Sequence, residues 1–140
     1  MFRINPLAVL VAAVCAFVMS SLYYSPLLLG NVWRAVDPVA SSMTFPPWKG
    51  VVEIVRTVGI TFVMARLVLL LGTNDVKSAM QLALWIWFGF SALMWVGAII
   101  WEGTPWQVAA IHSGDWLLKT LLIAVIVGLW SQRTATHGNP

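Results

Sequence analysis

The chain has 140 residues, of which 60% are hydrophobic and only 9% are charged, and its formal net charge is +3 at pH 7. Because soluble globular domains carry roughly 25% charged residues, this composition excludes that class and indicates an integral membrane protein. The eight Lys and Arg residues are scattered along the chain, which argues against nucleic-acid binding. We therefore expect one all-α domain, residues 1–140, embedded in the lipid bilayer.

The first predicted membrane span covers residues 6–26. Asn5 followed by Pro6 is typical of a helix N-cap and first helical position. The apolar run that follows is too long for a signal peptide and lacks a small-x-small cleavage site, so we interpret it as a retained helix. A stripe of small residues with a spacing of four predicts close packing against another helix. It consists of Ala8, Ala12, Ala16 and Ser20.

Residues 31–50 form the longest predicted connection, which is amphipathic and interrupted by prolines, and we expect it to lie along the lipid headgroups. The second predicted span, residues 51–71, is the least apolar because it contains Glu53, Arg56 and Arg66. The third, residues 78–101, carries no charge. Gly72 suits the C-cap of the second span and Asp75 the N-cap of the third, so the two are expected to form a tight antiparallel hairpin.

The fourth predicted span covers residues 106–130, and a polar tail follows. The loop before it contains a strong helix-boundary signal: Gly103 is expected to end one helix, and Thr104 to cap the next. Pro105 then takes the first helical position, and Gln107 completes a capping box. The sequence thus predicts an integral membrane four-helix bundle.

Four spans place both termini on one side of the membrane, and flanking cations predict which side. The terminus side has four of them, and the other side has two. They are Arg3, Arg66, Lys77 and Arg133 against Arg34 and Lys49. Because Lys and Arg accumulate in cytoplasmic loops, we predict a multi-pass protein of the cell inner (plasma) membrane with cytoplasmic termini.

Ionisable residues in the fourth span mark a candidate polar site. His112, Asp115 and Lys119 are spaced three and four apart, so they share one helix face. Lys119 is predicted to lie about 18 Å from the far end of its helix, close to the midplane of a ~30 Å hydrocarbon core. A lysine at that depth needs a partner or a wet cavity, and Asp115, one turn back, is the expected partner.

The predicted topology places further polar residues in the same half of the membrane as this row. The predicted cavity residues are Tyr23, Tyr24, Glu53, Arg56, Glu102, His112, Asp115 and Lys119. Two interpretations stay open. The network either forms a cavity that binds something, or it only holds helices together and lines a small aqueous depression.

Signals for enzymatic activity are poor. The sequence has no Gly-x-Ser-x-Gly, no glycine-rich phosphate loop and no pair of histidines at metal-ligand spacing. Ser113 and Asp115 beside His112 do not make a triad, because adjacent helix positions point apart. We therefore expect no catalytic residues, no metal, no cofactor and no enzymatic function.

Several segments resemble a bacterial membrane family known as domain-of-unknown-function family 1761. The matching residues are Asn5, Leu7–Leu10, Leu22–Pro26, Gly30, Trp33, Trp101–Gly103, Pro105–Trp106, Ile111, Gly114 and Trp130. The resemblance implies a four-helix membrane protein and carries over no established activity. His112, Ser113 and Asp115 depart from the family pattern, and Lys119 lies outside it.

Two functions follow as hypotheses. The first is a non-enzymatic module that binds a small or amphipathic ligand, or a partner protein, in the polar cavity. The alternative is a small proton-coupled transporter or permease, working as a dimer because four short helices make a narrow pathway. His112 and the acid–base pairs favour the transporter, and the absence of Gly or Pro breaks in the span centres argues against it. The expected partners are the lipid bilayer and either a second copy or another membrane protein.

Overall fold

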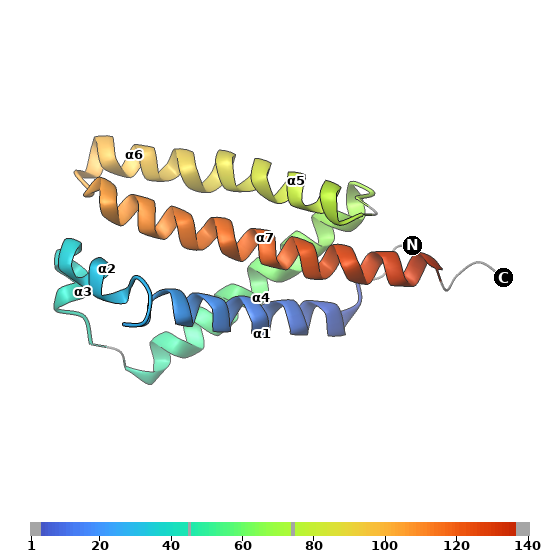
Figure 1. Cartoon of the computed structure of the whole chain (residues 1–140), viewed down its shortest axis with the longest axis horizontal. Helices are drawn as coiled ribbons and strands as arrows, with labels where there is room; N and C mark the ends of the chain where they lie inside the picture. The colour runs from blue at the N-terminus through green and yellow to red at the C-terminus, as the bar shows by residue number, and fades with distance from the viewer. Residues whose placement is uncertain (1–3, 45, 74, 137–140) are drawn as a thin grey trace.

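The computed structural model describes residues 4–44, 46–73 and 75–136, and it describes side chains as far as residue 130. This part of the chain is helical and contains no strand. In chain order the elements are α1 (Pro6–Tyr23), α2 (Gly30–Val36), α3 (Pro38–Ser41), α4 (Pro47–Leu70), α5 (Val76–Trp87), the π-helical segment η1 (Phe88–Ala92), α6 (Leu93–Glu102) and α7 (Trp106–Thr136). Figure 1 shows α5, η1 and α6 as one continuous rod beside α7, with α1 on the other flank of α7 and α4 crossing behind them.

Three of these helices are long and apolar enough to cross a membrane. They are Pro6–Tyr23, Val76–Glu102 and Trp106–Trp130. With 24 residues, α4 is also long, but Lys49, Glu53, Arg56 and Arg66 interrupt its apolar sequence and it is not among the three. The predicted fourth crossing therefore stays a prediction.

Predicted helix-terminal residues are confirmed at the start of α1, in the turn between α4 and α5 and in the turn between α6 and α7. Asn5 Oδ1 accepts a hydrogen bond from the Leu7 amide at 2.9 Å. Asp75 accepts one from the Ser78 amide, also at 2.9 Å, and its hydrogen bonds with Ser78 hold the pKa of this carboxyl below its usual range. Gly72 and Gly103 have φ values of 62° and 69°, the left-handed conformation of a helix C-terminus. Side-chain capping by Thr104 stays a prediction.

The predicted ends of the spans need small corrections. The first helix ends at Tyr23 rather than at residue 26, since Pro26 has no N–H and disfavours helical backbone at the residue before it. The helix predicted over 51–71 runs from Pro47 to Leu70, because proline is well suited to the first helical position. The third span runs over 76–102 rather than 78–101, and α7 continues past 130 to Thr136. Of the predicted N-terminal segment and tail, residues 1–3 and 137–140 lie outside the described residues.

Small residues form the centre of the molecule, as the stripe on the first helix predicts. Ala12 and Ala16 have no exposed surface and pack in one cluster with Ala65 of α4, Ala83 of α5 and Ala124 of α7. Small side chains let these helices approach closely, which is how membrane helices gain packing contacts. Many large apolar side chains instead point outward, although Met64, Val68 and Ile123 are buried in the cluster. Exposed examples are Leu10, Trp85 and Phe90, which are 57%, 74% and 74% exposed.

The π-helical segment η1 was not predicted, and it changes which side chains of the third span face α7. Trp87 Nε1 donates to the Ser113 carbonyl at 2.8 Å, and the Trp95 ring stacks on His112. In a regular α-helix two residues eight apart differ by roughly 80° in direction. The π-helical turn of η1 contains one extra residue, which offsets most of that difference between Trp87 and Trp95. The segment therefore turns both tryptophans toward α7.

Candidate functional site

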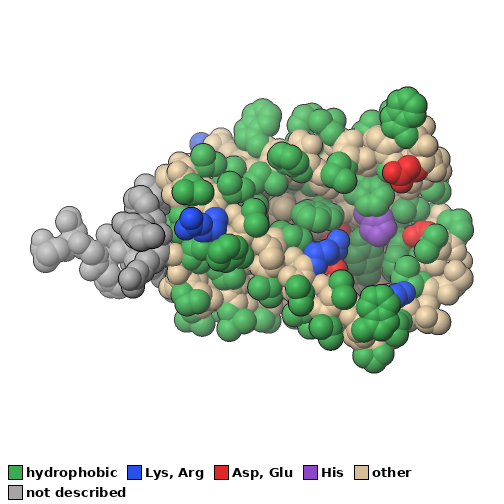
Figure 2. Space-filling model, turned by 180° about the vertical axis from the view of Figure 1, so that it is seen from behind, with side chains coloured by type: hydrophobic (Ala, Val, Ile, Leu, Met, Phe, Trp, Pro, Cys, Tyr) green, Lys and Arg blue, Asp and Glu red, His purple; other side chains and the backbone are tan. Residues whose placement is uncertain are grey.

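A cavity of about 710 Å³ opens between α1, α2, α4, α6 and α7. The space-filling view shows a histidine in a hollow, with basic and acidic side chains beside it (Figure 2); among the residues with described side chains this can only be His112. The lining residues are Phe17, Ser20, Ser21, Tyr24, Trp33, Arg34, Lys49, Gly50, Glu53, Arg56, Trp95, His112, Asp115 and Trp116.

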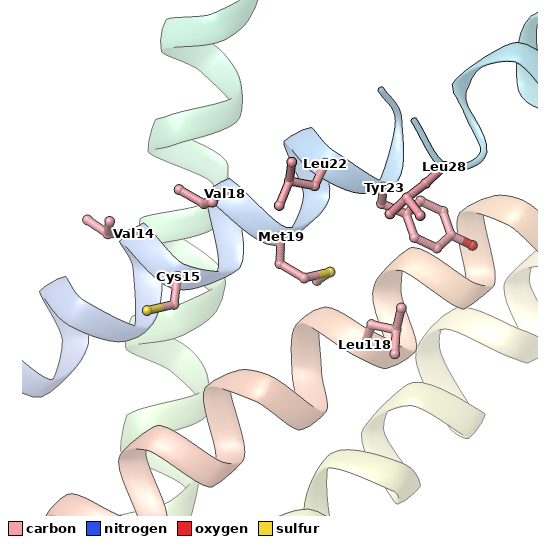
Figure 3. Close-up of a pocket in the computed structure, with 8 residues that line it drawn as sticks. All are labelled: Val14, Cys15, Val18, Met19, Leu22, Tyr23, Leu28 and Leu118. Carbon is pink, nitrogen blue, oxygen red and sulfur yellow. The ribbon is translucent and has the colours of Figure 1, made fainter. Parts of the chain in front are cut away.

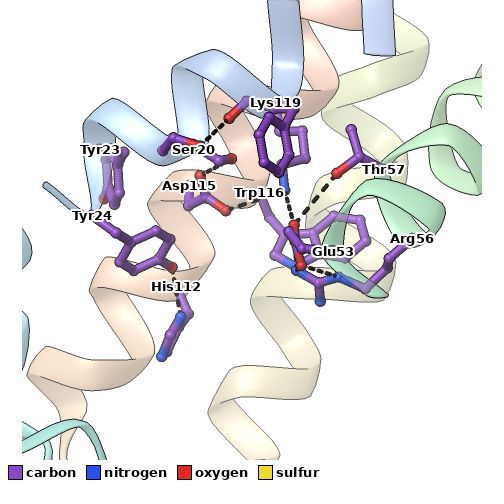
Figure 4. Close-up of polar contacts among 12 residues, drawn as sticks. Ser20, Tyr23, Tyr24, Glu53, Arg56, Thr57, His112, Asp115, Trp116 and Lys119 are labelled. Carbon is purple, nitrogen blue, oxygen red and sulfur yellow. Dashed lines mark hydrogen bonds and ion pairs between the residues drawn. The ribbon is translucent and has the colours of Figure 1, made fainter. Parts of the chain in front are cut away.

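Lys119 lies beneath this cavity and joins α7 to α4. Its side chain has no exposed surface. The Lys119 ammonium donates to Glu53 Oε1 at 3.1 Å, and it lies 3.7 Å from Asp115 Oδ2 (Figure 4). The predicted contact with Asp115 is therefore present, and Glu53 is the nearer of the two acids.

Glu53 is shared between a buried and an exposed cation. Arg56 lies three residues further along α4, and its Nε and Nη2 atoms donate to Glu53 Oε2 and Oε1 at 2.9 and 3.1 Å. Thr57 Oγ1 donates to Oε1 at 3.4 Å. The Arg56 guanidinium also lies over the Trp116 ring, 5.9 Å from its centroid. Both oxygens of the Glu53 carboxylate are thus engaged within the protein.

Asp115 connects α7 to α1 through a buried hydrogen bond. Ser20 Oγ donates to Asp115 Oδ1 at 2.6 Å, and Asp115 is only 3% exposed. Ser20 belongs to the small-residue stripe, which was predicted only as a packing surface. The bond completes a polar chain from Ser20 through Asp115 and Lys119 to Glu53, across three helices (Figure 4).

The side chains in contact with the His112 ring are aromatic rather than charged. The Tyr24 hydroxyl hydrogen-bonds His112 Nδ1 at 2.6 Å. Trp95 stacks on the imidazole with ring centroids 5.0 Å apart, and Trp33 meets it edge-on at 5.9 Å. Three elements, α1, α2 and α6, therefore hold this ring against the cavity wall.

Three of the eight predicted residues do not line the cavity: Lys119 lies beneath it, and Tyr23 and Glu102 lie elsewhere. The Tyr23 hydroxyl donates to the Ile111 carbonyl at 2.9 Å, and Tyr23 lines a separate apolar groove of about 450 Å³ on the opposite side of α1 (Figure 3). Glu102 is exposed at the end of α6 and is not part of the lining. Adjacent helix positions diverge by about 100°, so Tyr23 and Tyr24 cannot both face one cavity.

Several lining residues were missed because the folding of α2 over the cavity was not predicted. Residues 31–50 were predicted to lie along the headgroups. That position stays a prediction; within the molecule, Trp33 is buried against Tyr24 and His112, and this brings Arg34 to the cavity wall. The sequence shows only that Gly30 and Trp33 are three apart and so share one face of α2, which does not say what that face packs against. Among the described residues, no group of three or more His, Cys, Asp or Glu side chains could hold a metal ion.

Comparison with known proteins identifies a family for the chain and no characterised relative. No curated protein and no solved structure matches the chain. The family model described as "Protein of unknown function (DUF1761)" matches residues 7–128, which include every residue of the cavity. The chain therefore belongs to the DUF1761 family.

Proposed function

We propose that this protein is a non-enzymatic module of the cell inner membrane that binds a small amphipathic ligand in the cavity between α1, α2, α4, α6 and α7. The observation that carries the proposal is the cavity itself, about 710 Å³ in volume and lined by both aromatic and charged side chains. Ligand pockets typically have volumes of ~300–1,000 Å³ and combine apolar walls with a few polar groups. A network that served only to join helices would need no such opening.

Binding without catalysis agrees with the state of the polar groups. Glu53 and Asp115 already accept hydrogen bonds from Arg56, Lys119 and Ser20. A general base must be able to reach a substrate proton, and these carboxylates are instead engaged by the protein. The polar groups thus hold the helices around the cavity, and the aromatic rings supply contact area for a ligand.

We also propose that α4 crosses the membrane and makes the molecule a four-helix bundle. At 1.5 Å per residue its 24 residues extend about 36 Å, longer than a ~30 Å hydrocarbon core. Lys49, Glu53 and Arg56 lie near its start and line the cavity, and Arg66 lies near its other end. The charges that weaken its hydropathy thus occupy the cavity side and the helix ends, where charge is tolerated.

A pair of glycine variants tests ligand binding. Gly50 lines the cavity and Gly59 does not, yet both lie on α4 and neither has an atom within 4 Å of where a Cβ would stand. Gly50→Phe is expected to fill the cavity, and Gly59→Phe to leave it open on the opposite face of the same helix. Both proteins are purified in mild detergent, and native mass spectrometry records what is bound.

The expected result is a co-purifying small molecule on the unmodified protein and on Gly59→Phe that is absent from Gly50→Phe. The melting temperature of each variant shows whether it is folded. The same species on all three proteins, or on none after addition of a membrane lipid extract, would contradict binding in this cavity.

A proton-coupled carrier is the second candidate, and one observation favours it. The chain from Ser20 through Asp115 and Lys119 to Glu53 links titratable groups across the interior, and η1 interrupts the regular helix of the third span. Such a carrier would work as a homodimer. Protein in liposomes with an internal pH dye tests it: solute-dependent proton flux that Asp115→Asn abolishes would establish transport, and the binding module predicts no flux.

A further inference from the structure

We infer that the ligand of this cavity is a flat, uncharged ring compound of the quinone class. Its ring lies against the aromatic walls, and one of its carbonyl oxygens accepts a hydrogen bond from His112 Nε2. This inference rests on the proposed binding function and specifies its ligand class. It follows from the composition of the cavity walls, from the way in which His112 is held and from the uncharged contacts of its ring.

The apolar part of the cavity wall is aromatic. It consists of Phe17, Tyr24, Trp33, Trp95 and Trp116, and no Ala, Val, Leu, Ile or Met is among the described residues that line the cavity. The groove on the opposite side of α1 is different: apart from Tyr23, it is lined by valine, leucine, methionine and cysteine side chains (Figure 3). Aromatic rings pack on other rings in stacked or edge-on geometries. The contrast within one molecule therefore favours a flat ring, rather than an alkyl chain, as the apolar part of the ligand in the cavity.

These rings are turned toward the interior of the molecule. Trp33 is buried, and the other four are half-buried. By contrast, Trp101 and Trp106 at the turn between α6 and α7 are exposed, as is typical of aromatic residues at a lipid–water interface. Anchoring at the interface therefore does not account for the aromatic residues of the cavity.

His112 is held so that one polar atom of its ring stays available. Trp95 stacks on the imidazole with 11° between the ring planes, and Trp33 meets it edge-on at 79°. The Tyr24 hydroxyl occupies Nδ1 at 2.6 Å. Nε2 lies at the other end of the ring from Tyr24 (Figure 4) and has no hydrogen-bond partner among the described residues. Because His112 lines the cavity, Nε2 is the atom of this ring that a ligand can reach.

The bond to Tyr24 also sets what Nε2 can do. A neutral imidazole carries its proton on only one of its two nitrogens. Within the described part of the chain, the Tyr24 hydroxyl has no acceptor other than Nδ1, so it donates there. The imidazole proton then lies on Nε2. His112 thus offers a hydrogen-bond donor, and a ligand that satisfies it must carry an acceptor.

The surroundings of this donor favour an uncharged acceptor. The side chains in contact with the His112 ring are aromatic, and burying an ion against them without a counter-ion is costly. The acids of the cavity wall already have partners, because Glu53 pairs with Arg56 and Asp115 accepts from Ser20. A carbonyl oxygen conjugated to a flat ring satisfies the donor and the aromatic walls together. Quinones combine these two features and dissolve in lipid bilayers.

The test uses the full chain in phosphatidylcholine nanodiscs and four probes. Dimethylnaphthoquinone carries both methyl groups on its quinone ring, which blocks reaction with the exposed thiol of Cys15. Dimethylnaphthalene has the rings without the carbonyls, dodecanone has a carbonyl on a flexible chain, and naphthoate has a carboxylate on the rings. Binding is measured by native mass spectrometry and by the shift in melting temperature, and empty nanodiscs correct for partition into lipid. Dimethylnaphthoquinone is expected to bind roughly tenfold more tightly than each of the others, and Gly50→Phe is expected to abolish its binding.

A matched pair of variants tests the aromatic wall. Phe17→Leu makes one lining residue aliphatic, whereas Phe90→Leu makes the same change at a residue that is exposed outside the cavity. Phe17→Leu is expected to weaken the binding of dimethylnaphthoquinone and of dimethylnaphthalene several-fold, and to leave dodecanone unaffected. Phe90→Leu is expected to change none of them. Equal effects of the two variants would overturn the role of the aromatic wall.

The hydrogen bond is tested at His112. His112→Phe keeps a ring beside Trp95 and removes the donor, so dimethylnaphthoquinone is expected to bind about tenfold more weakly and dimethylnaphthalene as before. His112→Gln keeps an N–H donor and is expected to retain the preference for the quinone. Unchanged binding of dimethylnaphthoquinone to a folded His112→Phe protein would overturn the assigned hydrogen bond. If the melting temperature shows that this variant is unfolded, the comparison of the four probes on the unmodified protein still decides.

The outcomes separate this inference from the proposed function. If dodecanone or naphthoate binds as tightly as dimethylnaphthoquinone and Gly50→Phe blocks it, the cavity binds ligands but the quinone class is wrong. If no probe binds in a manner that depends on Gly50 while a co-purifying species does, this inference fails and the proposed function stands. If neither depends on Gly50, both fail. A quinone with an isoprenoid tail identifies the source: tighter binding than dimethylnaphthoquinone supports a lipid quinone, and weaker binding supports a small ring compound without a tail.

Discussion

Lys119 has no exposed surface, and two carboxylates lie 3.1 and 3.7 Å from its ammonium group. Removing an ammonium ion from water costs several kcal/mol, and only close, well-oriented partners offset that cost. Glu53 and Asp115 come from different helices, so their positions depend on how α4 packs against α7. The stability of this residue and the packing of the two helices are therefore coupled.

Lys119→Met is expected to lower the free energy of unfolding by roughly 3–5 kcal/mol, because it leaves the buried Asp115 carboxylate without a cation and Glu53 with Arg56 alone. Asp115→Asn should cost less, since Lys119 keeps the nearer Glu53 and an amide oxygen can still accept from Ser20. Thermal unfolding in detergent measures both. The triple variant Glu53→Gln/Asp115→Asn/Lys119→Met serves as a control and should recover part of the loss. Unchanged stability of Lys119→Met would mean that the ion pairs contribute nothing.

A second residue-scale prediction concerns Gly30, the first residue of α2. A Cβ there would stand against the Tyr24 carbonyl oxygen and 2.7 Å from the Ser25 carbonyl carbon. Backbone atoms cannot give way as a flexible side chain can. Gly30→Ala should therefore displace α2 and lower stability by about 1–3 kcal/mol. Gly97→Ala, with open space at its Cβ, should be neutral or slightly stabilising. Equal melting temperatures for the two variants would show that α2 shifts without cost.

Helix periodicity accounts for what could be predicted at single residues. The spacing of four between Asp115 and Lys119 predicted their contact, and the same rule explains the ion pair between Glu53 and Arg56, which are three apart. Contacts between distant segments follow no such rule. The bond from Ser20 to Asp115 spans 95 residues, and the enclosure of His112 depends on how α2 folds back, which no local spacing specifies.

At the scale of elements, the π-helical segment in the third span leads to a prediction about deletions. Deleting Gly89 should convert η1 to regular α-helix and keep Trp87 and Trp95 facing α7, because seven residues are close to two full turns. Deleting the exposed Leu84 should instead rotate Ala79 and Ala83, which are fully buried, by about 100° relative to Trp87.

The two deletions are compared by melting temperature in detergent. We expect the protein without Gly89 to melt within a few degrees of the unmodified protein, and the protein without Leu84 to be strongly destabilised. Strong destabilisation by both deletions would show that the π-helical turn of η1 is itself required. One reason would be to accommodate the buried Ser91 hydroxyl, which lacks a hydrogen-bond partner among the described residues.

At the scale of the whole molecule, composition predicted the helical class and the three apolar spans, because a long apolar run needs no knowledge of its neighbours. The ends of these helices followed from local cap residues such as Asn5 and Asp75. The closing of α2 over the cavity could not be predicted, since it depends on Trp33 meeting rings that lie on α1 and α7. The number of membrane crossings depends on α4. Its charged residues lower its hydropathy, so hydropathy alone does not decide whether this helix crosses the membrane.

Cysteine labelling resolves that number. Ser41 and Lys77 are exposed on either side of α4 along the chain, and Cys15 is replaced by alanine to remove background labelling. Four crossings place Ser41 on the opposite side of the membrane from Lys77 and from Ser131, whose side chain lies outside the described part. Three crossings, with α4 on the surface, place all three positions on one side. We expect an impermeant maleimide to modify Ser41→Cys in intact cells, and Lys77→Cys and Ser131→Cys only after lysis. Labelling of all three in intact cells would show that α4 does not cross. Labelling of only Lys77→Cys and Ser131→Cys would keep four crossings and reverse the orientation that the flanking cations predict.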